Sequence, residues 1–215
     1  MFEYFNILLH DTIALITILN PIAAASIMLG LLYPANPATI KPVALKATLT
    51  VVIASLVTLY SGEFIFKFFG ISVDSIKIIG GIVLLLLAMG MIQGEVSKNR
   101  HSKDENAEAQ EKEDISVIPL GIPILFGPGV IATIVVLQHS LNKSFPPIQS
   151  YLIETVAILL ASLFVYITLR YANALNKLLG VTGMKILTRV MGLIVGAIAS
   201  QFLVSGVKTL WNSAS

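Results

Sequence analysis

Long apolar stretches constrain the fold of this chain more than any other feature. A helix that crosses a ~30 Å hydrocarbon layer needs ~20 mostly apolar residues, and six stretches approach or exceed that length. They are Ile7–Leu32, Lys46–Phe69, Ile76–Ile92, Ile115–Leu141, Tyr151–Leu169 and Ile186–Leu210. Hydrophobic residues make up 56% of the sequence and charged residues 12%, which excludes an ordinary soluble domain. We therefore predict an all-α membrane protein with six transmembrane helices.

The basic residues predict how these helices cross the membrane. Cytoplasmic loops carry an excess of Lys and Arg, and ten of the 14 basic residues lie near the loops at 33–45, 93–114 and 170–185. We expect a multi-pass protein of the cell (inner) membrane, with the long loop cytoplasmic and both termini outside. The first stretch lacks a basic leader segment and precedes five others, so we expect it to remain uncleaved.

The charged loop divides the chain into two halves of similar plan. We predict a first three-helix repeat at residues 1–94, a flexible charged loop at 95–114 and a second repeat at 115–215. "NPIAAAS" from Asn20 and "GPGVIAT" from Gly127 are 107 positions apart, as are "IASLV" from Ile53 and "LASLF" from Leu160. "FFGIS" (68–72) and "LLGVT" (178–182) match with a slip of three residues. Because three is odd, the second repeat must insert inverted, a plan common in secondary transporters.

Asn-Pro and Gly-Pro pairs interrupt the first and fourth apolar stretches near their centres. Asn is a strong N-cap, and Pro at the first helical position loses no hydrogen bond. We therefore predict that Asn20-Pro21 and Gly127-Pro128 each start a new helix near the membrane midplane. A single such pair would favour a structural kink, since membrane helices tolerate Pro, but two at matching depths favour a site.

The predicted half-helix starts offer unpaired N–H groups that suit a carboxylate. We expect these groups to come from Ile22, Ala23 and Ala24 at one start and from Gly129, Val130 and Ile131 at the other. The carbonyl groups of Ile18, Leu19, Leu125 and Phe126 would suit an ammonium group. A zwitterion meets both demands, and the small neighbouring residues limit its size, although small residues equally serve close helix packing. The predicted substrate-binding residues are Asn20, Pro21, Ile22, Ala23, Ala24, Gly127, Pro128, Gly129 and Val130, with Thr17, Ser26 and Thr133 as additional polar contacts.

The chain resembles the MarC family at these same residues. The resemblance covers all six stretches and is most specific in "NPIAAASIMLGLL" (20–32) and "PLGIPILFGPGVIATIVVL" (119–137). It implies six helices in two inverted repeats, a central site at the broken first and fourth helices, and, for SnatA-type members, transport of glycine, alanine and similar amino acids. Alanines occupy much of the first break, where family members often have other residues. The resemblance therefore assigns the family's site only to Asn20, Pro21, Gly127, Pro128 and Gly129, and not to a full motif.

Other polar residues leave the coupling mechanism open. Asp11, Glu154 and Gln201 are polar residues within the spans and are therefore candidates for coupling. For His10 and Asp11, a structural pair at the membrane interface is the more common alternative to a proton relay. Glu154 lies close enough to a helix end for its side chain to reach the membrane surface. Lys77 is expected to anchor a helix at the headgroups. The hydroxyl groups near the breaks could equally bond to their own helix. The coupling ion, proton or sodium, is not specified.

Other classes of function fit the residues less well. No nucleophile–base pair or metal cluster is apparent, so we expect no enzyme; we likewise expect no metal, cofactor or nucleic-acid partner. The chain has no cysteine, which excludes disulfides and thiol chemistry. A channel, or an exporter of another small solute, is the main alternative because broken helices also build pores. The expected partners are a small zwitterionic amino acid and the lipid bilayer; a homo-oligomer and either direction of transport stay open.

Overall fold

The computed structural model describes residues 2–33, 36–94 and 115–214, and the regular structure in these ranges is helical. The predicted flexible loop at 95–114 lies outside the described residues. The elements are α1 (Phe2–Leu19), α2 (Pro21–Leu31), α3 (Pro37–Phe68), α4 (Val73–Gln93), η1 (Ser116–Leu125), α6 (Pro128–Ser144), α7 (Pro147–Arg170) and α8 (Ala172–Ala214).

The helices have the length and composition of membrane spans. Within the described ranges, five are long and apolar enough to cross a membrane, with α1 and α2 counted as one, and the bent pair of η1 and α6 brings the number to six. The predicted all-α membrane class is therefore confirmed. Several helices begin earlier than the predicted stretches, most of all α3 at Pro37 and α8 at Ala172, because a helix can continue through less apolar residues beyond the membrane-spanning part.

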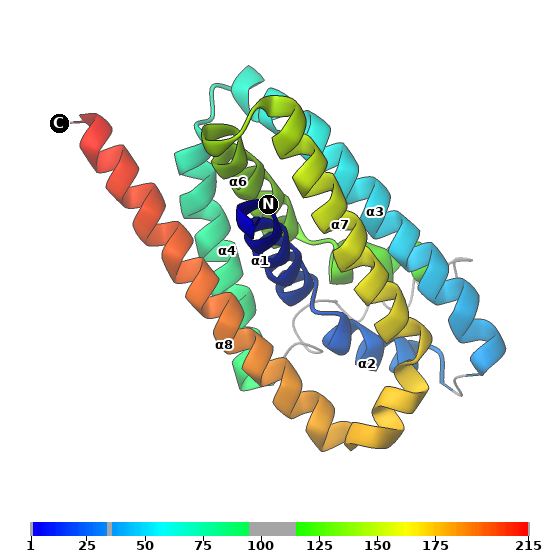
Figure 1. The fold of residues 1–215 in the computed structure, drawn as a ribbon. Helices are drawn as coiled ribbons and strands as arrows, with labels where there is room; N and C mark the ends of the chain where they lie inside the picture. Colours follow the sequence, from blue (N-terminus) through cyan, green and yellow to red (C-terminus); the bar gives the residue numbers. More distant parts are fainter. Residues whose placement is uncertain (1, 34–35, 95–114, 215) are drawn as a thin grey trace.

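The helices form a bundle in which α1 and α6 lie between two outer pairs (Figure 1). One outer pair is α3 and α7, and the other is α4 and α8. The pair of α4 and α8 is antiparallel: Gly81 lies against Ala199, whereas Gly192 lies against Ala88. Glycines in these contacts let the two backbones approach closely, as in many membrane helix pairs.

The core of the bundle is apolar and faces inward from every span. Leu15, Met28, Leu84, Leu120 and Ile134 are among its fully buried side chains. Large apolar side chains also cover the outside of the bundle, including Phe64 on α3, Leu86 on α4, Leu163 on α7 and Leu193 on α8. Lipid chains in a bilayer can cover such an apolar surface, whereas in water it would remain in unfavourable contact with the solvent.

Two glycines with positive φ end helical segments at related places in the two halves. Gly70 has φ +69° in the turn after α3, and Gly180 has φ +63° and interrupts α8. Glycine adopts this conformation without the steric cost that other residues incur. These are the central residues of "FFGIS" and "LLGVT", the pentapeptides that match between the halves.

Candidate functional site

The first break is a single residue in the left-handed conformation. Asn20 has φ 46° and ψ 61° and separates α1 from α2, which begins at Pro21. The Asn20 side-chain Oδ1 accepts a hydrogen bond from the Ala23 N–H at 3.4 Å. Asn20 is therefore the N-cap of α2, as the sequence predicted, and its side chain is buried.

This cap leaves fewer free N–H groups than predicted. The Ala23 N–H is bonded to the Asn20 side chain, and the Ala24 N–H donates to the Asn20 carbonyl at 3.2 Å. The expectation that both amides would be open to a ligand is wrong, because Asn20 satisfies them. Of the three predicted groups, Ile22 is the one whose N–H does not donate to Asn20.

The second break is a sharper bend. The axes of η1 and α6 differ by 57°, and α6 begins at Pro128 after an extended Gly127. Ile118 and Ile122 inside η1 are also extended, because each precedes a proline, which disfavours the helical conformation. The first part of the fourth stretch is thus irregular at Ile118 and Ile122, in addition to the predicted start of a new helix at Pro128.

Two of the first N–H groups of α6 are also hydrogen-bonded within the same segment. The N–H groups of Val130 and Ile131 donate to the Gly127 carbonyl at 2.9 and 3.4 Å, so these two amides are not open as predicted. The Gly129 N–H does not share this acceptor. Ile22 and Gly129 therefore each have an N–H group in the first turn of a helix, where an amide has no acceptor within its own helix.

The two breaks lie close to each other through Gly129. A Cβ atom built on Gly129 would lie 2.7 Å from Leu84 Cδ2 and 3.9 Å from Ile18 Cγ2. Ile18 is two residues before Asn20, so the start of α6 packs beside the end of α1. Gly129 is buried in this contact, which supports the close-packing role for small residues that the sequence left open.

The hydroxyl groups near the breaks bond to their own helices. Thr17 donates to the Ile13 carbonyl at 2.7 Å, Ser26 to Ile22 at 3.2 Å and Thr133 to Gly129 at 2.8 Å. This is the back-bonding alternative to ligand contact. Each hydroxyl oxygen still has acceptor capacity that its own donated bond does not use.

A cavity of about 360 Å³, here called the Thr133 cavity, extends from one end of the bundle to Thr133, one helical turn beyond the second break. It lies among α1, α4, α6 and α8, and Thr133 is four residues beyond Gly129 along α6. Its polar lining residues are His10, Asp11, Lys77, Thr133, Ser140, Ser144, Gln201 and Ser205.

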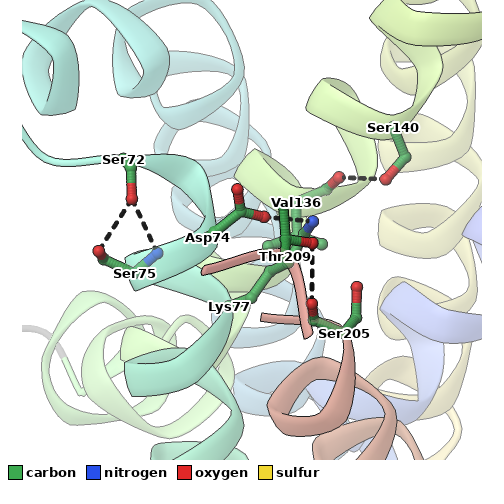
Figure 2. Close-up of polar contacts among 8 residues, drawn as sticks. All are labelled: Ser72, Asp74, Ser75, Lys77, Val136, Ser140, Ser205 and Thr209. Carbon is green, nitrogen blue, oxygen red and sulfur yellow. Dashed lines mark hydrogen bonds and ion pairs between the residues drawn. The ribbon is translucent and has the colours of Figure 1, made fainter. Parts of the chain in front are cut away.

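Lys77 of α4 lines this cavity, and Figure 2 shows it beside residues of α6 and α8. Its Nζ lies 2.8 Å from Asp74 Oδ1, and Lys77 is only 7% exposed. The prediction that Lys77 anchors a helix at the headgroups is therefore wrong. The i, i+3 spacing of Asp74 and Lys77 is a sequence signal for this pair. Hydroxyl groups of Ser140 and Ser205 lie on the same cavity wall.

A second cavity of about 370 Å³, the Ser26 cavity, reaches the first break from the opposite end. Ala23 and Ser26 of α2 line it, together with Gly94 after α4 and the first half of α8 between Asn176 and Thr188. The Thr133 cavity instead touches the start of α4 and the second half of α8. The two cavities therefore approach the breaks from opposite ends of the same helices.

The predicted site residues divide between these cavities and the packed backbone beside them. Ala23, Ser26 and Thr133 line a cavity. The remaining predicted residues line neither of these two cavities: Thr17, Asn20, Pro21, Ile22, Ala24, Gly127, Pro128, Gly129 and Val130. The predicted residues thus do not line one common pocket: three line one or the other cavity and nine line neither.

Sequence comparison assigns the chain to a family. Residues 5–211 match the family described as MarC family integral membrane protein. The chain belongs to the MarC family. A UPF0056 membrane protein of Aquifex aeolicus is 32% identical over 98% of this MarC chain and 96% of its own length. The UPF0056 membrane protein YhcE of Escherichia coli is 34% identical over 93% of this chain and 91% of its own. No solved structure matches the chain.

The names of these relatives are consistent with the membrane-spanning helices described above. Their names identify them as membrane proteins, and the family match covers every predicted span. The MarC-family chain is therefore an integral, multi-pass membrane protein that contacts the lipid bilayer.

Proposed function

We propose that this MarC-family protein is a secondary transporter of small neutral amino acids such as glycine and alanine. Alternating access would occur at a central site between the broken first and fourth spans, with no chemical reaction catalysed. The observation that carries the proposal is the pair of cavities that approach the two breaks from opposite ends of the bundle. Alternating access requires two such paths to one central region, each closed while the other is open.

Contacts that recur between the halves support a pair of inverted repeats. The packing of α1 on α7 corresponds to that of η1 on α3, and the packing of α4 on α6 corresponds to that of α8 on α2. A Cβ on Gly81 would lie 3.0 Å from the Ala199 carbonyl oxygen, and a Cβ on Gly192 would lie 3.1 Å from that of Ala88. Gly81 and Gly192 are separated by the same interval as Ala88 and Ala199, which is the reciprocity expected of two-fold related helices.

The groups beside the breaks favour a small zwitterion. The N–H groups of Ile22 and Gly129 can donate to a carboxylate, helped by the positive ends of two helix dipoles. Ser26 and Thr133, which line the two cavities, bond to the carbonyl groups of these same two residues. Both cavities are near the lower end of the volumes typical of ligand pockets, so a small amino acid fits better than a large one.

Counterflow in proteoliposomes tests the proposal. Vesicles loaded with unlabelled glycine should take up labelled glycine or alanine transiently and with saturation, whereas labelled arginine should stay at the level of empty vesicles. A non-saturating flux without counterflow would indicate a channel and overturn the carrier. Counterflow with another small solute, but not with glycine or alanine, would overturn the substrate class.

A plug variant links this transport to the cavities. Gly30 lines the Ser26 cavity, and a Cβ built there meets no atom within 4 Å. Gly30→Phe should therefore fill the cavity without a steric clash at its own backbone and abolish counterflow. Gly90→Phe is the matched control, because Gly90 also has open space but does not line either cavity. Equal transport by the two variants would contradict the role of the Ser26 cavity.

A further inference from the structure

Two carboxyl groups lie inside the bundle where α1 packs against α7. Glu154 of α7 is 0% exposed, and Asp11 of α1 is 3% exposed. Asp11 is the charged group that interacts with Glu154, and α1 and α7 form one of the main helix contacts of the fold. The idea that Glu154 reaches the membrane surface is therefore wrong, since its side chain is enclosed by protein.

The Glu154 carboxyl is buried and has another carboxyl, that of Asp11, as its polar neighbour. No donor group of the described residues bonds to its oxygens, so a hydrogen bond between the two carboxyls requires a proton on one of them. The buried hydroxyl of Thr12, next to Asp11, is also unbonded in the described part of the chain. An unpaired carboxylate in such a place is costly, whereas a protonated carboxyl or a bound cation removes the charge. Two adjacent carboxyls can also share one proton, because both cannot easily be ionised together. Packing alone gives no reason for an acid at this position.

Asp11 connects this buried acid to the Thr133 cavity. Asp11 lines that cavity, and its Oδ1 lies 2.8 Å from His10 Nδ1. The His10 side chain is 72% exposed, whereas that of Asp11 is 5% exposed. His10, Asp11 and Glu154 thus form a sequence from the surface to the buried acid, and imidazole and carboxyl groups are the usual members of proton relays in transporters.

We propose that Asp11 and Glu154 form a proton-binding pair that couples solute transport to proton movement. A proton enters through His10 and Asp11 while the Thr133 cavity is open, is held on Glu154 as the bundle rocks, and leaves when Glu154 becomes accessible from the other end. Only O–H and N–H bonds form and break in these steps. The inference rests on the proposed function, because it names the coupling site of the same carrier.

Other titratable groups on the neighbouring helices interact with other residues than this pair. They are Tyr60 and Glu63 on α3, Asp74 and Lys77 on α4, His139 on α6 and Tyr151 on α7. Glu63 is the useful comparison, because its Oε2 accepts a hydrogen bond from Asn142 Nδ2 at 3.4 Å. It is a carboxyl on a membrane helix with an amide donor as its partner, whereas the neighbour of Glu154 is another carboxyl.

The test measures protons and solute in the same vesicles. Proteoliposomes that contain the pH dye pyranine should change their internal pH when glycine is added to wild-type protein. Glu154→Gln should reduce this change at least about tenfold, within the usual range of coupling between sites. Glu63→Gln, the matched control, should keep it, and Glu154→Asp should retain a measurable part because it restores a titratable carboxyl. Gel filtration in detergent checks that each variant is folded.

The outcomes separate the coupling site from the transport function. Wild-type counterflow without any glycine-dependent change of pH would overturn the inference alone, and glycine-dependent uptake of labelled sodium would then identify sodium as the coupling ion. A Glu154→Gln variant with the wild-type pH change would also overturn it. Absence of counterflow with glycine or alanine in wild-type vesicles would instead overturn the proposed function.

Discussion

The two breaks occupy equivalent places in the chain but are built by different chemistry. At the first break, one left-handed residue supplies the whole interruption, and the side chain of Asn20 caps the helix that follows. At the second break, no side chain caps α6, and the segment before it is irregular, with extended Ile118 and Ile122. The bend there is 57°.

This difference separates what the two breaks share from what is particular to each. Both breaks end in a helix that starts with Pro, and a hydroxyl residue five positions after that Pro, Ser26 or Thr133, lines a cavity. The local device that turns the chain differs between them. The first break thus depends on one side chain, whereas the second depends on packing, and a helix that starts with Pro follows both.

The largest expected effect comes from filling the packed second break. Gly129→Val should abolish counterflow and destabilise the protein by about 3 kcal/mol, as expected for severe overpacking, because its Cβ would lie 2.7 Å from Leu84 Cδ2. Thermal unfolding in detergent and counterflow measure the two effects. The double variant with Leu84→Ala tests the cause: recovery of both indicates packing, and recovery of stability without transport indicates that Gly129 also contacts the ligand.

The next effect should appear at the first break. Asn20→Ala should cost about 2 kcal/mol, because it loses the cap and places a non-glycine, non-Asn residue at φ 46°. Asn20→Gly also loses the cap, but glycine adopts the left-handed conformation easily. It should therefore lower the free energy of unfolding clearly less than Asn20→Ala does. Thermal unfolding of both variants checks the order. A Gly variant as unstable as the Ala variant would show that the left-handed conformation is not what Asn20 provides.

The reciprocal glycines should respond alike. Gly81→Ala and Gly192→Ala should each destabilise the α4–α8 contact by about 1 kcal/mol, because each new Cβ would lie 2.8 Å from a side-chain atom of the other helix. Gly90→Ala is the control with open space. Thermal unfolding that affects only one of the two glycines would argue against the two-fold relation between these helices.

The smallest effect should come from the back-bonded hydroxyls. Thr133→Val removes a hydroxyl that donates to the Gly129 carbonyl and should change stability by less than about 1 kcal/mol. If that hydroxyl contacts the solute, the concentration for half-maximal counterflow will rise while stability stays nearly constant. An unchanged concentration dependence would restrict its role to the helix.

The sequence predicts the helices and the first break because each depends on local signals. Apolar length identifies the spans, and Asn before Pro identifies the start of α2. The irregular η1 is harder to predict, because Pro119 and Pro123 are visible but the path of the chain between them depends on packing against α3. The burial of Lys77 and Glu154 depends on α8 and α1, which are distant in sequence, so no local pattern distinguishes them from surface charges.

Single cysteines at the two cavities test the central claim most directly, because the natural chain has none. Ser26 and Gln201 are both exposed and line the Ser26 and Thr133 cavities, respectively. In sealed right-side-out vesicles, a membrane-impermeant maleimide added outside should label Gln201→Cys and leave Ser26→Cys unlabelled until the vesicles are opened. Labelling of both cysteines from the outer side of intact vesicles would contradict the account, because the two cavities would then open to one side of the membrane.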